Sequence, residues 1–128
     1  MADFVTNCSC VRSQAIRLTL PLPPSLNNLY KNAGKRRVTT VEYEDWKFRA
    51  GFAAKKAGRN PITGGYVVYL GLPKKMRGDI DNRFKPVLDL LVRMNITPDD
   101  RHCQGVMAWR HDCIDPEQCE VLIDECSQ

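Results

Sequence analysis

The sequence predicts an α/β (α+β) fold, in which a single two-layer domain carries the helices on one face of a mixed sheet. Three observations lead to this prediction. The 128 residues suffice for one hydrophobic core. Segments with strand-like alternation and segments with helical spacing follow one another in the order β-α-β-α-β-β. No apolar run approaches the ~20 residues that a membrane span needs, so no segment is expected to cross a bilayer.

The first strand and the first helix are separated by a long polar segment. Residues 15–20 alternate between apolar and polar side chains and end at three nearby prolines, which indicates a strand. Residues 25–37 show no apolar period and are predicted to form a long loop, of a length that is often functional. Thr39, with Glu42 three residues later, predicts a capping box for a helix that runs to about residue 57.

The second half of the chain predicts a strand, a helix and two more strands. Residues 66–72 form an apolar run between a Gly-Gly turn and a proline, which favours a strand. Residues 82–94 carry apolar side chains at helical spacing, and Pro86 is tolerable there because it lies near the helix start. Residues 105–110 and 119–124 are predicted to pair as the two strands of a hairpin.

The cysteines raise the question of a disulfide framework or a zinc site. No signal peptide precedes the domain, so we expect the reducing cytoplasm, where disulfides are rare. No Cys-x-x-Cys pair occurs, and the histidines do not stand at zinc-finger spacing. We interpret residues 1–14 as a polar leader whose composition permits disorder, and residues 15–128 as the domain. The six cysteines, interpreted as free and mostly buried thiols, are Cys8, Cys10, Cys103, Cys113, Cys119 and Cys126.

Charge is distributed unevenly along the chain. Residues 31–85 hold fourteen of the 19 Lys and Arg and five of the 15 acids, a net of +9. Residues 86–128 hold three Lys and Arg and nine acids, a net of −6. Two solvated faces would explain this, and so would a basic surface that neutralises phosphates while part of the acid holds a metal. Charge alone does not choose between these explanations.

Four aspartates gather in the sequence around the second predicted helix. Asp79 and Asp81 are two apart in what we expect to be extended chain, so both side chains point to one side. The helix and the turn after it bring Asp99 and Asp100 back into the same neighbourhood. Clustered carboxylates repel one another unless protons or a cation compensate. Oxygen ligands without His or Cys suit Mg²⁺, or Mn²⁺ as a substitute, better than zinc.

Structural explanations remain open for the same residues. Asp81 could be an N-cap and Asp99-Asp100 a turn, and short Asp-x-Asp matches are often accidental. A calcium loop fails, because Arg83 and Phe84 stand where an oxygen ligand and a glycine are required.

Lys85 follows Asp81 by one helical turn and has two interpretations. It could neutralise charge that develops on a phosphoryl oxygen, or it could form an ordinary surface ion pair with Asp81 or Asp89. Together with the basic segments, the acids suit phosphodiester hydrolysis assisted by a metal. The residues predicted to contact DNA are Asn27, Lys31, Lys35, Arg36, Arg37, Lys74, Lys75 and Arg77.

Two motifs resemble the RusA family of Holliday-junction resolvases over about residues 16–124. The first, followed by nine residues and then Asp99-Asp100, is Asp79-x-Asp81-Asn82-x-x-Lys85-x-x-x-Asp89. The second is Leu20-Pro21-Leu22-Pro23-Pro24-Ser25-Leu26-Asn27. There are departures: Gly78 stands where the family often has Arg, Pro86 follows the Lys, and Cys103 replaces an aliphatic residue.

The resemblance implies a Mg²⁺-dependent homodimeric endonuclease that nicks four-way DNA junctions in pairs during recombination and repair. By similarity, Asp79, Asp81 and Asp100 would be the catalytic carboxylates that bind the metal, and Lys85 would be an essential basic group of the catalytic site. Two alternatives remain. One is a metal-dependent nuclease that acts on flaps, forks or RNA-containing structures, and the other is a non-catalytic junction-binding protein of the same fold.

Overall fold

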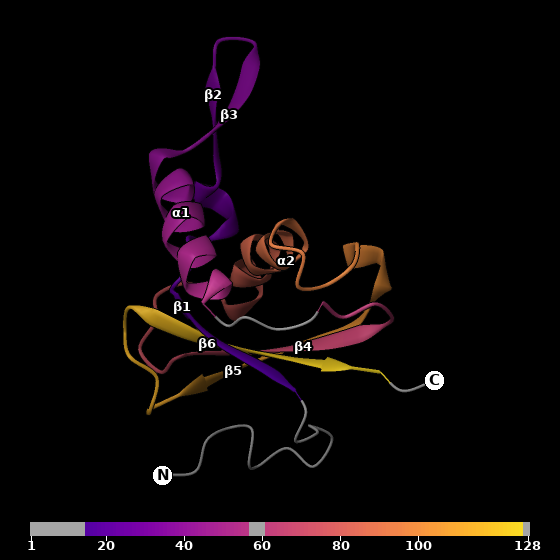
Figure 1. Cartoon of the computed structure of the whole chain (residues 1–128). Helices are drawn as coiled ribbons and strands as arrows, with labels where there is room; N and C mark the ends of the chain where they lie inside the picture. Colours follow the sequence, from indigo (N-terminus) through magenta and orange to yellow (C-terminus); the bar gives the residue numbers. More distant parts are fainter. Residues whose placement is uncertain (1–14, 57–60, 127–128) are drawn as a thin grey trace.

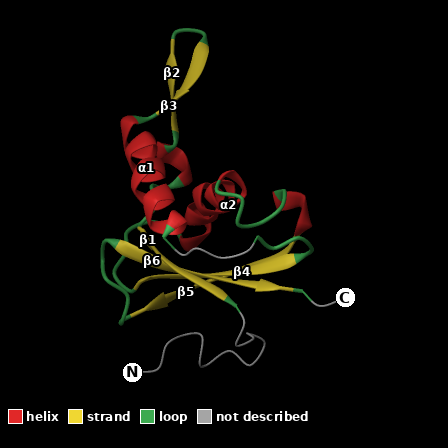
Figure 2. Ribbon diagram, in the orientation of Figure 1, coloured by secondary structure: helices red, strands yellow, loops and turns green. Residues whose placement is uncertain are grey.

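Two helices pack on the same face of a four-stranded sheet (Figure 1, Figure 2). The computed structural model describes residues 15–56 and 61–126. Its mixed sheet and two helices form a single α+β domain, which confirms the predicted fold class. The leader predicted over residues 1–14 lies outside the described residues.

The order of strands in the sheet is β1-β6-β4-β5. The bounds of these strands are β1 (Ile16–Pro21), β4 (Tyr66–Pro73), β5 (Cys103–His111) and β6 (Gln118–Glu125). Strand β6 runs antiparallel to both β1 and β4, whereas β4 and β5 run parallel. The hairpin predicted from residues 105–110 and 119–124 is therefore wrong, because β4 lies between β5 and β6.

The physical reason lies in the crossover between β4 and β5. Parallel strands need a connection of a dozen or more residues, and the helical segment after β4 provides it. That connection carries the chain to the outer edge of β4, so β5 becomes an edge strand. The opposite edge of β4 is then left for β6, which also pairs with β1.

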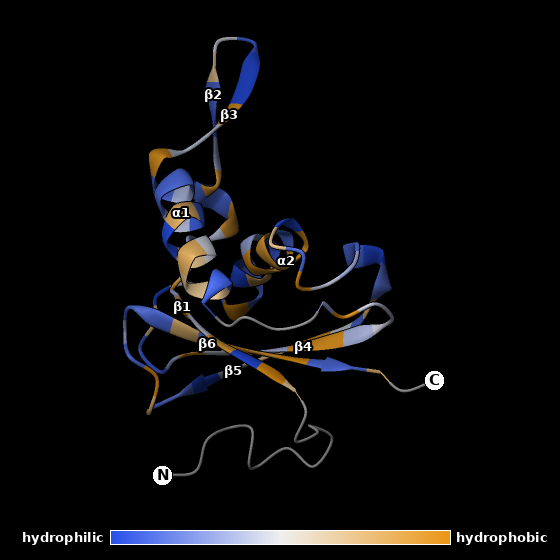
Figure 3. Ribbon diagram, viewed as in Figure 1, coloured by the Kyte–Doolittle hydropathy of each residue, from blue (hydrophilic) through white to orange (hydrophobic). Residues whose placement is uncertain are grey.

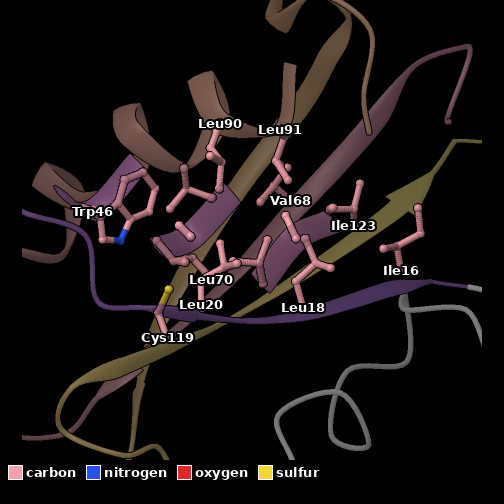
Figure 4. Close-up of a cluster of buried hydrophobic side chains, with 14 of the residues drawn as sticks. Ile16, Leu18, Leu20, Trp46, Val68, Leu70, Leu90, Leu91, Cys119 and Ile123 are labelled. Carbon is pink, nitrogen blue, oxygen red and sulfur yellow. The ribbon is translucent and has the colours of Figure 1, made fainter. Parts of the chain in front are cut away.

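The core lies between the helices and the sheet (Figure 4). In β1 the alternate residues Ile16, Leu18 and Leu20 are buried, as the strand period requires. The helices contribute Trp46, whose indole nitrogen donates a hydrogen bond to the Pro21 carbonyl at 2.7 Å, and the buried Leu91. A tryptophan can be buried here because its one polar atom has a partner.

Helix α1 (Val41–Lys55) begins one residue later than predicted. Its N-cap is Thr40, whose hydroxyl oxygen accepts a hydrogen bond from the Tyr43 amide at 3.2 Å. The hydroxyl of Thr39, the predicted cap, instead donates to the Glu44 carboxylate at 2.5 Å. The capping box with Glu42 is therefore wrong, although a threonine cap was expected. The end predicted near residue 57 falls outside the described residues.

The segment predicted as a long loop is largely regular structure. It contains the 3-10 turn η1 (Leu26–Asn28) and the strands β2 (Tyr30–Ala33) and β3 (Arg36–Thr39). The two strands pair antiparallel and project away from the sheet (Figure 1). Gly34 takes φ of +69° at the first position of their two-residue turn, as a type II′ hairpin requires. We call β2, β3 and this turn the basic hairpin.

The second helical region joins two kinds of helix. The 3-10 turn η2 (Ile80–Arg83) leads into helix α2 (Phe84–Arg93), and a further 3-10 turn, η3 (Asp100–His102), precedes β5. The prediction of one helix over residues 82–94 is therefore correct for α2 alone. Pro86 lies in the first turn of α2, where a backbone N–H has no partner inside the helix.

Candidate active site and DNA-binding surface

Asp79 and Asp81 lie on the turn that connects β4 to α2, and both are exposed. Asp79 is the N-terminal flanking residue of η2 and has an extended backbone, whereas Asp81 lies within the turn. The expectation that both occupy extended chain is therefore wrong. Neither carboxylate caps a helix, because no side-chain hydrogen bond closes the start of η2 or of α2. The N-cap explanation for Asp81 is thus excluded.

Asp99 and Asp100 have different positions at the other end of the helical connection. The Asp99 carboxylate accepts a hydrogen bond from the Arg101 amide at 3.1 Å and so caps η3. This backbone hydrogen bond, aided by the side chain of Asp100, holds the pKa of Asp99 below its usual range. Asp99 therefore stabilises the turn. Asp100, the first residue of η3, is exposed and does not cap it.

Lys85 lies on the first turn of α2 and forms an ion pair with Asp89, with 3.1 Å between Nζ and Oδ1. The hydrogen bond to Asp89 and the charge of that carboxylate raise the pKa of Lys85, and the charge of Asp100 adds to the effect. Of the two ion pairs considered for Lys85, the structure therefore shows the one with Asp89. The Asp100 carboxylate also lies close enough to Lys85 to raise its pKa.

The segments that carry the acids are neighbours in space. Turn η2 contacts both α2 and β5, and η3 contacts α2. Within residues 15–56 and 61–126, however, no three His, Cys, Asp or Glu side chains lie close enough together to hold a metal ion. Carboxylates repel one another when no cation is bound, which favours separated side chains.

The family model described as "Endodeoxyribonuclease RusA" matches residues 21–123, which are most of the chain and include every acid discussed above. The chain belongs to the RusA family. It is therefore an endodeoxyribonuclease, a hydrolase that acts on DNA, in a family of metal-dependent enzymes that resolve Holliday junctions. No curated protein matches the chain.

In this RusA chain the basic hairpin carries four of the fourteen Lys and Arg found in residues 31–85. Its cations are exposed and lie along both strands and the turn: Lys31, Lys35, Arg36 and Arg37. The Arg37 guanidinium stacks over the Tyr30 ring at 4.6 Å, which stiffens one of these side chains. Figure 3 shows the hairpin as largely hydrophilic. Asn27 lies on η1 and is also exposed.

Below the hairpin, a cleft of about 180 Å³ opens between β2, β3 and the two helices. Lys47 and Arg93 face it, together with two tyrosines. Burial and the charge of Asp89 raise the pKa of Tyr43 to about 12, so its hydroxyl stays neutral below that pH. The lining residues are Tyr30, Thr39, Tyr43, Lys47, Asp89, Leu90 and Arg93. The sequence analysis missed this cleft, because its residues come from four separate elements.

The segment between β4 and η2, residues 74–78, forms a second basic surface, which we call the connector. Lys74, Lys75 and Arg77 are exposed on it, and their contact with DNA stays a prediction. Its backbone is held by two arginines that the sequence analysis did not single out, Arg83 and Arg110. No motif marks them, because Arg110 reaches the connector from β5.

The cysteines of the described chain take no part in this site. Cys103, Cys113, Cys119 and Cys126 are free thiols, as predicted, although Cys119 alone is fully buried. Burial raises the pKa of the Cys119 thiol, which makes it unreactive. Cys8 and Cys10 lie outside the described residues. No helix in the described chain is long and apolar enough to span a membrane.

Proposed function

We propose that this chain resolves four-way DNA junctions by paired, symmetric nicking that depends on Mg²⁺. One observation carries the assignment within its family: Asp79, Asp81 and Asp100 are exposed acids that cap no helix, whereas Asp99 is engaged as a cap. The structural explanations that competed with a catalytic role therefore apply to Asp99 and not to the other three.

Asp79, Asp81 and Asp100 would hold the metal. Their oxygen donors have the chemistry that a hard divalent cation prefers, with Mn²⁺ as a substitute. The three carboxylates are not gathered into a cluster in the described chain, so we propose that they come together only as the cation and the DNA bind. A bound Mg²⁺ would supply polarisation of the scissile phosphate and a water of lowered pKa.

Lys85 supplies a fixed positive charge beside the acids. Because Asp89 raises its pKa, Lys85 remains protonated well above neutral pH. An ammonium group held on the first turn of α2 can stabilise the negative charge that develops on a phosphate oxygen. Asp89 orients this group from the next turn of the helix.

The basic hairpin and the connector would hold the DNA backbone on either side of the acids. Exposed Lys and Arg bind phosphates by displacing counterions, and this contact does not depend on base sequence. The DNA-binding proposal covers Asn27, Lys31, Lys35, Arg36, Arg37, Lys74, Lys75 and Arg77.

We further propose that two copies act together. A four-way junction presents two equivalent strands related by a two-fold axis, and a homodimer presents two equivalent sites related in the same way. Paired nicks at symmetric positions are what such a dimer would produce. The cytoplasmic location stays a prediction.

The decisive experiment incubates purified protein with a synthetic four-way junction, with and without Mg²⁺. We expect nicks at symmetry-related positions only when the metal is present. Flaps, replication forks and linear duplexes serve as competing substrates. Preferential cleavage of flaps or forks would overturn the resolvase assignment and favour a nuclease of different specificity. Junction binding without cleavage, in either Mg²⁺ or Mn²⁺, would favour a non-catalytic binding protein.

Two neighbouring substitutions test the metal ligands. Asp100→Asn should abolish cleavage, because it removes a proposed ligand. Asp99→Asn is the matched control, because an asparagine oxygen can still accept the hydrogen bond from the Arg101 amide and cap η3. If both variants lose activity equally, or if only Asp99→Asn does, the assignment of Asp100 is wrong.

A further inference from the structure

The connector backbone turns its carbonyl groups inward onto a guanidinium from the edge strand. Arg110 Nη1 donates to the Met76 carbonyl at 2.5 Å and to the Lys74 carbonyl at 3.4 Å. Its Nη2 donates to the Gly78 carbonyl at 2.6 Å. That carbonyl belongs to the peptide bond that joins Gly78 to Asp79, so Arg110 holds the backbone directly before a proposed metal ligand.

A second guanidinium holds the preceding peptide. Arg83 Nη2 donates to the Arg77 carbonyl at 2.9 Å, while its Nη1 donates to the Pro23 carbonyl at 2.5 Å. Burial lowers the pKa of Arg83, and the neighbouring positive charge of Arg110 adds to this. Arg83 therefore ties the connector to the turn after β1, and it lies close to Arg110.

Gly78 makes this arrangement possible. Its φ of +87° lies in the left-handed region, which residues with a Cβ rarely adopt. A Cβ at this position would lie 3.6 Å from Arg83 Nη2. The backbone reversal at Gly78 lets two successive carbonyls, those of Arg77 and Gly78, both reach the arginines. This explains why glycine stands here, directly before the first acid of the motif.

We propose that Arg83 and Arg110 form an arginine clamp that positions Asp79 and the cations of the connector for the reaction. The inference rests on the proposed function and names positioning residues for that site. Neither guanidinium forms an ion pair with an acid in the part of the chain that the structure describes. Both guanidinium groups instead donate their hydrogen bonds to backbone carbonyls, and these bonds fix the connector. The side chains of Lys74, Lys75 and Arg77 stay exposed.

The clamp is tested with Arg110→Met, which keeps an unbranched apolar stem but removes all three hydrogen bonds. Two amides report on the loop: Met76, which donates to the Pro73 carbonyl at 3.2 Å, and Asn82, which donates to the Asp79 carbonyl at 3.3 Å. We expect faster hydrogen exchange at these two amides, with unchanged exchange in β4 and β6. Arg49→Met is the matched control, because Arg49 pairs with Asp45 on an exposed face of α1.

Single-turnover cleavage rates, compared with junction affinities, then show whether Arg110 positions the reacting groups or only supports DNA binding and stability. Arg110→Met should lower the single-turnover cleavage rate by about tenfold to a hundredfold, because small misplacements of reacting groups cost that much. Junction affinity without metal should change by less than about threefold, since binding rests on many phosphate contacts. Arg110→Lys should recover only part of the rate, because an ammonium group cannot span the three carbonyls as a guanidinium does.

The outcomes are distinguishable from a failure of the proposed function. Unchanged exchange at Met76 and Asn82 would overturn the clamp, whatever the substrate proves to be. Faster exchange with wild-type cleavage would overturn the positioning role, as would a rate loss that merely follows weaker binding. Should Arg110→Met not fold, Gly78→Ala disturbs the same backbone through its φ and is expected to give the same local exchange and the same rate loss.

Discussion

Adjacent residues of the same type can have different roles, as Asp99 and Asp100 show. Both carry a carboxylate, but only Asp99 accepts a backbone amide. Sequence spacing identified the pair and favoured its second member by family resemblance. It could not identify the capping residue, because that depends on which side chain faces the Arg101 amide within a three-residue turn. At the residue scale, the motif can therefore be recognised from the sequence, but the separate role of each aspartate within it cannot.

Asp81→Asn should abolish cleavage and leave junction binding unchanged or tighter. The substitution removes a proposed metal ligand and at the same time removes a negative charge that repels phosphate. Single-turnover cleavage with Mg²⁺ and band-shift titration without it measure the two effects separately. Asp112→Asn, an exposed acid beyond β5, is the control for a general change in charge. Normal cutting by Asp81→Asn would show that the proposed ligand set is wrong.

The ion pair between Lys85 and Asp89 predicts a pH effect with a definite sign. Asp89 raises the pKa of Lys85, so Asp89→Asn should bring that pKa back toward the ordinary lysine value. If a protonated Lys85 is needed for cleavage, the alkaline limb of the rate profile should move to lower pH in this variant. Rate profiles of both proteins above pH 8, in matched ionic strength, test this. An unmoved alkaline limb would show that Asp89 does not control the charge used in cleavage.

Lys85→Ala should slow cleavage by more than it weakens binding. Loss of one charge that stabilises a developing oxyanion costs about a hundredfold or more in rate, whereas one phosphate contact contributes modestly to affinity. Comparing single-turnover rates with dissociation constants separates the two. A defect in binding alone would make Lys85 a simple phosphate anchor.

At the scale of elements, the strands with an apolar face were predicted from the sequence, whereas the two strands of the basic hairpin were not. The predicted strands 15–20, 66–72 and 119–124 fall within a residue or two of β1, β4 and β6. In contrast, β2 and β3 have no buried face, so no alternation of hydropathy marks them. The glycine of their turn was the available signal. A two-residue turn with Gly34 between polar segments is a hairpin signature that hydropathy alone overlooks.

Replacing Lys35, Arg36 and Arg37 by Ala should weaken junction binding and reduce its salt dependence. All three are exposed on the basic hairpin, and none of them belongs to the buried core. If each contacts a phosphate, the slope of log affinity against log salt should fall by up to about 3. Fluorescence anisotropy over a range of salt concentrations measures the slope, and Arg49→Ala on α1 is the control. An unchanged slope would remove the hairpin from the interface.

At the scale of the whole molecule, the layers were predicted and the strand order was not. Composition and periodicity indicated helices on one face of a mixed sheet, and the structure confirms this. The pairing of the last two strands was wrong because sequence neighbours pair by default. The structure shows that β4, buried along its length except for one half-buried residue, pairs with β5 along one edge and with β6 along the other. Which strand pairs with each edge is a property of the assembled sheet.

Leu70→Ala should lower the free energy of unfolding by about 2–5 kcal/mol, because it leaves a cavity in the core under both helices. Leu70 is 0% exposed in the central strand. Val106→Ala on the edge strand is the control, since Val106 is 41% exposed and should cost under about 1 kcal/mol. Urea denaturation of both variants measures the difference. Equal losses would show that the core is not centred on β4.

The position of β6 has a consequence for synthesis of the protein. This strand forms hydrogen-bonded ladders with both β1 and β4, although Gln118–Glu125 is the last strand in sequence order among the described residues. On the ribosome, synthesis must proceed from β1 to Gln118 and beyond before β1 meets β6, the strand with which it pairs in the described sheet. Until then the apolar sides of β1 and β4 remain open to water and to other nascent chains. The sheet can therefore be completed only after β6 has been synthesised.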